Sequence, residues 1–173
     1  MARKPKPLAE PELYNYALKA LAARARSVAE MRSRLERRAE RAQDVRTVMA
    51  RLKEHGYLND DRFAQSFAAA RLENERLGRV RVVRDLRARL VAPEVAERAA
   101  RETYQDVDEA ELLEQHLAHR LRRTGPPQTP REVASLYRAL RRAGFSHGAI
   151  VDPLRQFKAD PELLDSLEEE ETT

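Results

Sequence analysis

The chain has 173 residues, of which 36% are charged and 42% are hydrophobic, and it contains neither Cys nor Trp. The lack of Cys excludes a disulfide scaffold, a Cys-based zinc site and a thiolate nucleophile. The longest apolar runs, such as residues 68–70, fall far short of the roughly 20 residues that cross a bilayer, and no signal-peptide apolar region is present. We therefore expect a cytoplasmic protein that does not bind membranes.

Charge is distributed unevenly along the chain. Residues 1–50 carry 12 basic and 6 acidic side chains, residues 51–105 carry 12 and 9, and residues 106–173 carry 9 and 14. Of the 33 basic residues 28 are Arg, whose planar guanidinium suits the recognition of phosphates and carboxylates. A biased codon composition would produce the same excess, so the Arg content alone decides nothing.

Residues 13–57 predict the first group of three helices. One helix begins near Pro11, and a second follows Ser27, which forms a capping box with Glu30. A third ends at Gly56, a residue that takes the left-handed conformation without steric cost. The apolar residues at helical spacing are Leu13, Tyr16, Ala17, Ala20 and Leu21, then Met31 and Leu35, then Val45, Val48, Met49 and Leu52.

Residues 58–106 repeat this plan. Either Asn59 or Asp60 caps the first helix, Gly78 opens the second, and Pro93 stands at the first position of the third, where its missing N–H is harmless. Phe63 and Phe67 are the expected core anchors. The apolar faces are Phe63, Ala64, Phe67 and Ala68, then Val82, Val83, Leu86 and Leu90, then Val95, Ala96, Ala99 and Ala100.

Residues 107–159 predict a third group. Thr129 caps its middle helix together with Glu132, and Ser146 precedes the last helix. Pro153 removes a backbone hydrogen bond inside that last helix and is expected to kink it. The apolar faces are Ala110, Leu113, Leu117 and Leu121, then Val133, Leu136 and Leu140, then Ile150, Leu154 and Phe157.

The spacing of the three middle helices indicates a repeat. Leu35, Leu86 and Leu140 are separated by 51 and 54 residues, and this near-period is typical of tandem helical arrays. The prediction is an all-α fold of three three-helix repeats. A basic segment over residues 1–12 and an acidic one over 160–173 are expected to be flexible.

Most catalytic chemistries lack their motifs. The sequence has neither GxxxxGK[ST] nor GxGxxG, and Ser occurs without a nucleophile elbow. His116 and His119 lie near Glu114, but two His without a third ligand favour a solvent-exposed helical face over a metal site. Asp60 and Asp61 are interpreted as helix-capping residues. We therefore expect no catalytic residue, no metal and no cofactor.

The strongest signal is a basic helix within residues 76–89, where six Arg are opposed by Asp85 alone. With the apolar residues turned inward, helical geometry places Arg81, Arg84 and Arg87 on the outward face. Such a ridge suits a phosphate backbone or an acidic protein groove, although an ordinary solvated face remains the alternative. Further Arg at the junction of the first two helices and on the second helix add basic surface; they are Arg24, Arg26, Arg32, Arg34, Arg37, Arg38 and Arg41.

Four ordered motifs resemble those of the RecX family of bacterial regulatory proteins. They are residues 17–35, the segment Gly56-Tyr-Leu-Asn-Asp-Asp-Arg-Phe-Ala64, the pattern Gly78-x-x-Arg81-Val82-x-x-x-Leu86 and the segment Leu140-Arg-Arg-Ala-Gly-Phe-Ser146. The resemblance spans about residues 17–157. The sequence departs from the family where Gly commonly ends the middle helix, since Ala39 and Leu90 stand there, and at Pro153.

The resemblance implies a non-enzymatic regulator that binds the RecA filament on single-stranded DNA and mostly inhibits its ATPase, strand exchange and coprotease activities. It also implies direct DNA binding, with double-stranded DNA left open as a ligand. Together with the charge pattern it leads us to expect a monomeric, elongated and curved array. The residues expected to contact the filament or DNA are Arg24, Arg26, Arg79, Arg81, Arg84 and Arg87. The alternatives are a dimeric helix-turn-helix transcription regulator and a structural helical adaptor.

Overall fold

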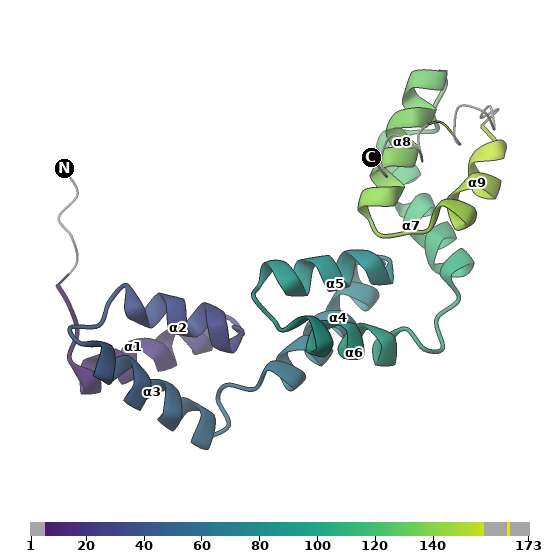
Figure 1. The fold of residues 1–173 in the computed structure, drawn as a ribbon. Helices are drawn as coiled ribbons and strands as arrows, with labels where there is room; N and C mark the ends of the chain where they lie inside the picture. The colour runs from purple at the N-terminus through teal and green to yellow at the C-terminus, as the bar shows by residue number, and fades with distance from the viewer. Residues whose placement is uncertain (1–5, 158–165, 167–173) are drawn as a thin grey trace. The chain divides into compact units, whose positions relative to one another are not determined.

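The computed structural model describes residues 6–157 and residue 166. Over this part of the chain it has nine α-helices and no strand (Figure 1). The helices are α1 (Glu10–Ala23), α2 (Val28–Glu36), α3 (Ala42–Glu54), α4 (Asp60–Glu75), α5 (Arg79–Ala88), α6 (Pro93–Thr103), α7 (Glu109–Thr124), α8 (Pro130–Arg142) and α9 (His147–Arg155). The predicted all-α fold is confirmed.

Contacts divide the chain into two compact units. One comprises Met1–Phe67 with Asp85–Ala99, and the other comprises Ala68–Arg84 with Ala100–Thr173. The helices α4, α5 and α6 therefore each pass from one unit to the other within a single helix. The repeat boundaries predicted after residues 57 and 106 do not coincide with the divisions between these two units, and they stay predictions.

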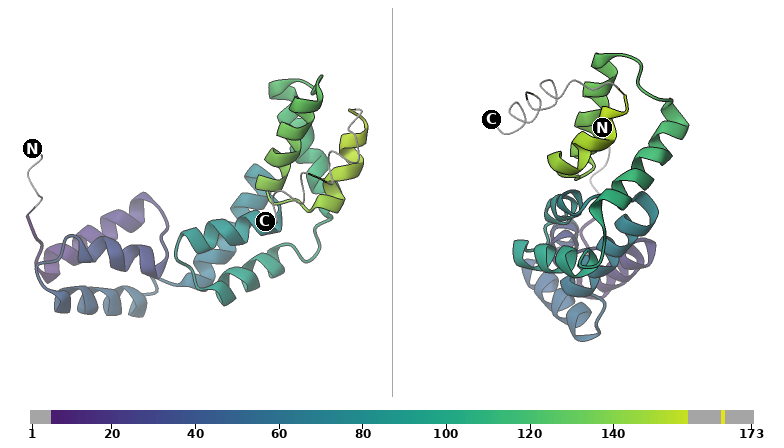
Figure 2. Two further views of the ribbon diagram at one scale, coloured as in Figure 1. Left: turned by 45° about the horizontal axis from the view of Figure 1, so that its top comes forward. Right: turned by 90° about the vertical axis from the view of Figure 1, so that its right-hand side faces the viewer.

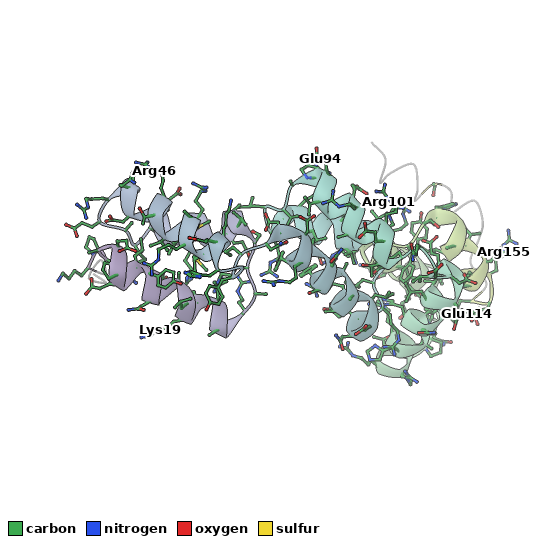
Figure 3. The ribbon with its side chains drawn as sticks, turned by 90° about the horizontal axis from the view of Figure 1, so that it is seen from below. Lys19, Arg46, Glu94, Arg101, Glu114 and Arg155 are labelled. Carbon is green, nitrogen blue, oxygen red and sulfur yellow. The ribbon has the colours of Figure 1, made fainter. Side chains whose placement is uncertain are left out.

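The core of the first unit contains α1, α2 and α3, which contact one another pairwise and lie side by side (Figure 2). Leu13, Ala17, Met31, Leu35 and Leu52 are fully buried between them, as the helical spacing predicts. The two outer members of the first apolar stripe, Tyr16 and Leu21, are only half-buried because they lie at the edge of this core.

The predicted helix caps are present. Ser27 Oγ accepts a hydrogen bond from Glu30 N at 3.0 Å while the Glu30 carboxylate accepts one from Ser27 N at 3.0 Å, and Thr129 and Glu132 form the second capping box. Asn59 rather than Asp60 caps α4, since its Oδ1 accepts from Arg62 N at 2.9 Å.

The first unit also joins its three-helix core to parts of the following helices. Asp60 Oδ1 accepts a hydrogen bond from Val28 N at 2.8 Å, and Ser27 Oγ donates to Arg89 O at 2.6 Å. The Arg89 guanidinium lies 5.0 Å from the Phe63 ring centroid and 5.4 Å from that of Phe67. Phe63 is buried as predicted, whereas Phe67 is half-buried.

The expectation of a flexible segment over residues 1–12 is wrong for its last part. Leu8 N donates to Arg38 O at 2.7 Å and Leu8 O accepts from Glu40 N at 2.9 Å, and the Leu8 side chain packs against the core. Residues from Glu10 onward already belong to α1. Except for Ser166, the acidic segment predicted over 160–173 lies outside the described residues.

In the second unit α9 contacts both α7 and α8. The large buried residues of this unit include Tyr137, Phe145, Ile150 and Leu154. Pro153 lies inside α9, and the helix continues past it to Arg155. It does not split the helix: Pro153 stands two residues before the end, and the missing N–H removes a single hydrogen bond of the last turn.

A backbone contact within the second unit joins the start of α5 to the turn between α8 and α9. Gly78 N donates to Ala143 O at 2.8 Å, and a Cβ atom at Gly78 would overlap the carbonyl group of Gly144. Gly144 itself has φ +97°. This close approach explains why Gly stands at both positions.

Candidate nucleic-acid interface

Two exposed Arg of the basic helix α5 have no internal partner among the described residues. Val82, Val83 and Leu86 are buried, which directs Arg84 and Arg87 to the opposite side, where both are exposed. Neither guanidinium has a hydrogen bond or an ion pair within the described part of the chain. These two side chains are therefore available to an anion without first giving up an internal partner.

The outward display predicted for Arg81 is wrong. Arg81 is half-buried, and its Nη1 donates to Arg142 O at 3.0 Å. It faces the turn after α8 because the Gly78–Gly144 contact brings that turn against the first residues of α5. Arg79 lies two residues earlier, at the first position of α5, and is exposed. Arg81 thus connects two segments of the second unit, which the apolar spacing of α5 alone does not reveal.

Arg24 and Arg26 lie between α1 and α2, as predicted. Arg24 is exposed and forms an ion pair with Glu30 at 3.4 Å. Arg26 is half-buried, and its Nε donates to Ala20 O at 3.3 Å. Burial lowers the pKa of Arg26, and the positive charges of Arg24 and Arg34 lower it further. An approaching anion would offset the repulsion between these positive charges.

A second group of Arg lies against an aromatic ring of α1. The guanidinium carbons of Arg34 and Arg38 are each 5.0 Å from the ring centroid of Tyr16. The Nε atoms of both Arg are buried without a hydrogen-bond partner, and neither side chain has a carboxylate partner among the described residues. Sequence reasoning placed Tyr16 in the core and so missed this cluster, because its residues come from α1, from α2 and from the turn after α2.

A cleft of about 470 Å³ opens in the first unit between the end of α1, the loop after α3 and the first half of α4. Leu18, Leu21 and Phe63 form its apolar side, and Arg26, Tyr57 and Arg62 are among its polar lining. Tyr57 belongs to the segment Gly56–Ala64 that carries the family resemblance, but nothing in the sequence indicates that its ring is exposed.

The described residues offer no alternative site of obvious chemistry. No group of three or more His, Cys, Asp and Glu in this part of the chain could hold a metal ion. His116 does not lie on the exposed face expected for it; it is half-buried, with its ring centroid 5.4 Å from that of Phe145. No helix within residues 6–157 is both long and apolar enough to cross a membrane.

Comparison with known proteins decides the family. The models of the first and second three-helix domains of RecX match residues 14–52 and 59–99. A regulatory protein RecX of Deinococcus radiodurans is 36% identical over 147 residues, which cover 83% of this chain and 67% of the relative. That of Trichlorobacter lovleyi is 34% identical over 135 residues, which cover 78% and 84%. The chain belongs to the RecX family.

The RecX fold is also recognised in three dimensions. The crystal structure of RecX from Lactobacillus salivarius aligns with a TM-score of 0.64 at 17% identity, over 86% of this chain and 96% of that one. The resemblance inferred from the four motifs is thereby confirmed, and the all-α repeat fold with it. This RecX family member is a regulatory protein, as its relatives are named.

Proposed function

We propose that the protein binds the RecA filament on single-stranded DNA and mostly inhibits its recombinase, ATPase and coprotease activities. It acts as a monomer by binding rather than by catalysis, and it also contacts DNA directly. Membership of the RecX family supports the choice of partner. The arrangement of its Arg side chains supports the mode of binding.

The observation that carries this proposal is the unpaired state of Arg84 and Arg87. Some exposed Arg of the chain gain a carboxylate neighbour, as Arg98 does with Asp61. Arg84 and Arg87 instead stand one turn apart on α5 with no such neighbour among the described residues. Two unpaired guanidiniums on a rigid helix suit phosphates or an acidic protein surface.

The direct test is the DNA-dependent ATPase of RecA, measured with and without this protein. We expect the rate to fall when the protein is added to preformed filaments. Inhibition well below stoichiometric amounts would indicate blocked filament growth, whereas inhibition that saturates at a fixed ratio to RecA would indicate binding along the filament. An unchanged rate at saturating protein would refute the proposal.

The Arg of α5 are tested by charge reversal. We expect the double substitution Arg84→Glu with Arg87→Glu to weaken binding to RecA filaments and to reduce the slope of log affinity against log salt by about 2. The matched control reverses Arg46 and Arg101, which are exposed on α3 and α6 and change the net charge equally. Equal losses in both double variants would assign the effect to net charge instead of to α5.

The helix-turn-helix alternative makes a different prediction about DNA. A transcription regulator would be a dimer and would prefer a defined duplex over random DNA by several orders of magnitude. We expect no such preference, because the unpaired Arg form a surface for backbones without a dimer axis to set the spacing of half-sites. Binding of duplexes of random sequence, measured beside sedimentation of the free protein, distinguishes the two.

A further inference from the structure

The cleft in the first unit has an apolar part, here called its wall, and a cationic part, here called its rim. Leu18, Leu21 and Phe63 line the wall, and Arg26 and Arg62 belong to the rim. No carboxylate is among the described residues that line it. A ligand that fits must therefore combine an apolar surface with negative charge.

Tyr57 is the exposed aromatic residue of this cleft. Its side chain is 52% exposed, one of three large hydrophobic residues that stay so open within the described chain. Its backbone is nevertheless fixed, since Tyr57 N donates to Leu52 O at 2.8 Å directly after Gly56, which has φ +69°. The Tyr57 ring centroid lies 6.2 Å from that of His55, and much of the residue is uncovered, which leaves ring surface for stacking.

The two Arg of the rim differ in their exposure and in their contacts. Arg62 is exposed and its guanidinium donates to Gly56 O, in the turn that also positions Tyr57. Arg26 is half-buried and repelled by neighbouring Arg. Both retain further N–H donors, because a guanidinium has five. An anion beside Tyr57 could therefore be bound by charge-assisted hydrogen bonds from two sides.

We propose that this cleft holds one unstacked base of single-stranded nucleic acid, with the base against Tyr57 and its flanking phosphates on Arg26 and Arg62. A nucleic-acid strand offers a flat ring and a negative charge in each repeating unit, which matches the lining. Exposed Asn59 and Ser66, which also line the cleft, can donate to the edge of the base. This site rests on the DNA-binding part of the proposed function and is distinct from the Arg of α5.

Two further Arg of the same unit offer cations beyond the cleft. Arg26 is close enough to Arg34 and Tyr16 for their charges to act on it. Arg34 and Arg38 lie over the Tyr16 ring without a carboxylate partner among the described residues. We include Arg34 and Arg38 in the proposal as contacts for the next phosphates, because aromatic and cationic groups alternate in this way in single-strand channels.

The experiment compares two strands of equal length and charge, an oligothymidylate and an abasic strand that has the same backbone without bases. The full chain is titrated with each, in the absence of RecA. We expect it to bind the oligothymidylate more tightly, and we expect Tyr57→Leu to weaken that binding about tenfold while leaving the abasic strand unaffected. Tyr57→Phe should behave as the parent, because it keeps the ring.

The Arg of the rim give a second measurement. Arg62→Gln should weaken binding of both strands to the same extent, because phosphate contacts do not sense the base. Arg46→Gln, at an exposed Arg of α3 that bonds to Gln43, is the matched control and should change neither. Photocrosslinking of a strand containing iodouracil should mark Tyr57, whose position mass spectrometry identifies.

Several results would overturn the site. Equal binding of both strands by the parent, or an unchanged preference in Tyr57→Leu, would exclude a base at Tyr57. If Tyr57→Leu weakened binding to the RecA filament alone, the cleft would hold a protein side chain instead. Loss of RecA inhibition with an intact preference for bases would contradict the proposed function and leave this site standing.

Discussion

Two residues other than Gly hold a left-handed backbone conformation in the described chain, Arg76 with φ 51° and Leu90 with φ 62°. Each follows the end of a helix, α4 and α5 respectively. For a residue with a Cβ atom this conformation costs about 1–2 kcal/mol. At Leu90 the side chain is 58% exposed, so burial recovers little of that cost, and the Gly expected there from the family resemblance would avoid it.

We therefore expect Leu90→Gly to raise the free energy of unfolding by up to about 1 kcal/mol, since relief of strain exceeds the added entropy of the unfolded chain. Urea unfolding followed by circular dichroism measures it. Ala50→Gly, at an exposed position in the middle of α3, is the control and should lower stability by about 1 kcal/mol. Equal losses in both variants would show that Leu90 is not strained.

His116 makes the stability of the protein depend on pH. Its Nδ1 lies 3.3 Å from Glu75 O. Burial lowers its pKa, and although the carbonyls of Glu75 and Arg76 raise it, Arg120 and His119 lower it again. Because the folded pKa lies below the unfolded value of about 6.5, the unfolded chain binds the proton first as the pH falls.

His116 therefore has no effect on the free energy of unfolding above about pH 6.5. Below that pH it destabilises the fold, and this destabilisation grows until the folded state is protonated as well and then stays constant. We expect the urea midpoint to fall more steeply between pH 7 and pH 5 in the parent than in His116→Gln. Titration of the His116 ring by NMR should give a pKa below its usual value. Parallel midpoint curves for the two proteins would contradict this assignment.

At the scale of the helix, two capping boxes with the same chemistry lie in different surroundings. Ser27 is fully buried and its Oγ both caps α2 and donates to Arg89 O. Thr129 caps α8 at the surface. We expect Ser27→Ala to cost about 2 kcal/mol because it also leaves a carbonyl unsatisfied, and Thr129→Ala about 1 kcal/mol. Chemical unfolding of both variants checks the order, and the reverse order would refute the second role of Ser27.

The start of α5 depends on contact between two backbones. A methyl group at Gly78 would overlap the Gly144 carbonyl, whereas one at Gly148, inside α9, would meet no atom within 4 Å. We expect Gly78→Ala to lower stability by about 1–3 kcal/mol and Gly148→Ala to raise it by up to about 1 kcal/mol. Thermal unfolding measures both. If Gly78→Ala melted with the parent, the close approach of the two segments would be wrong.

Across the whole molecule, the sequence predicts what is local. The helices, both capping boxes and the buried stripes follow from spacing and from residues such as Ser27, Thr129 and Leu86. Contacts between distant segments do not, because no periodicity records them: Arg81 bonds to Arg142, and Leu8 pairs with Arg38 and Glu40. For the same reason, the four motifs reveal the family, while the exposure of Tyr57 and the unpaired state of Arg34 become apparent only in three dimensions.

The ties of Ser27 and Val28 to Arg89 and Asp60 limit how such proteins can recombine. A hybrid that exchanges the first three helices between relatives by joining them in the loop after α3 would take the Ser27 hydroxyl from one parent and the side chain of residue 60 from the other. Viable hybrids should instead inherit α1 to α3 together with residues 60 and 89 from one parent. The segment that must be exchanged as a whole is thus longer than the three helices α1 to α3.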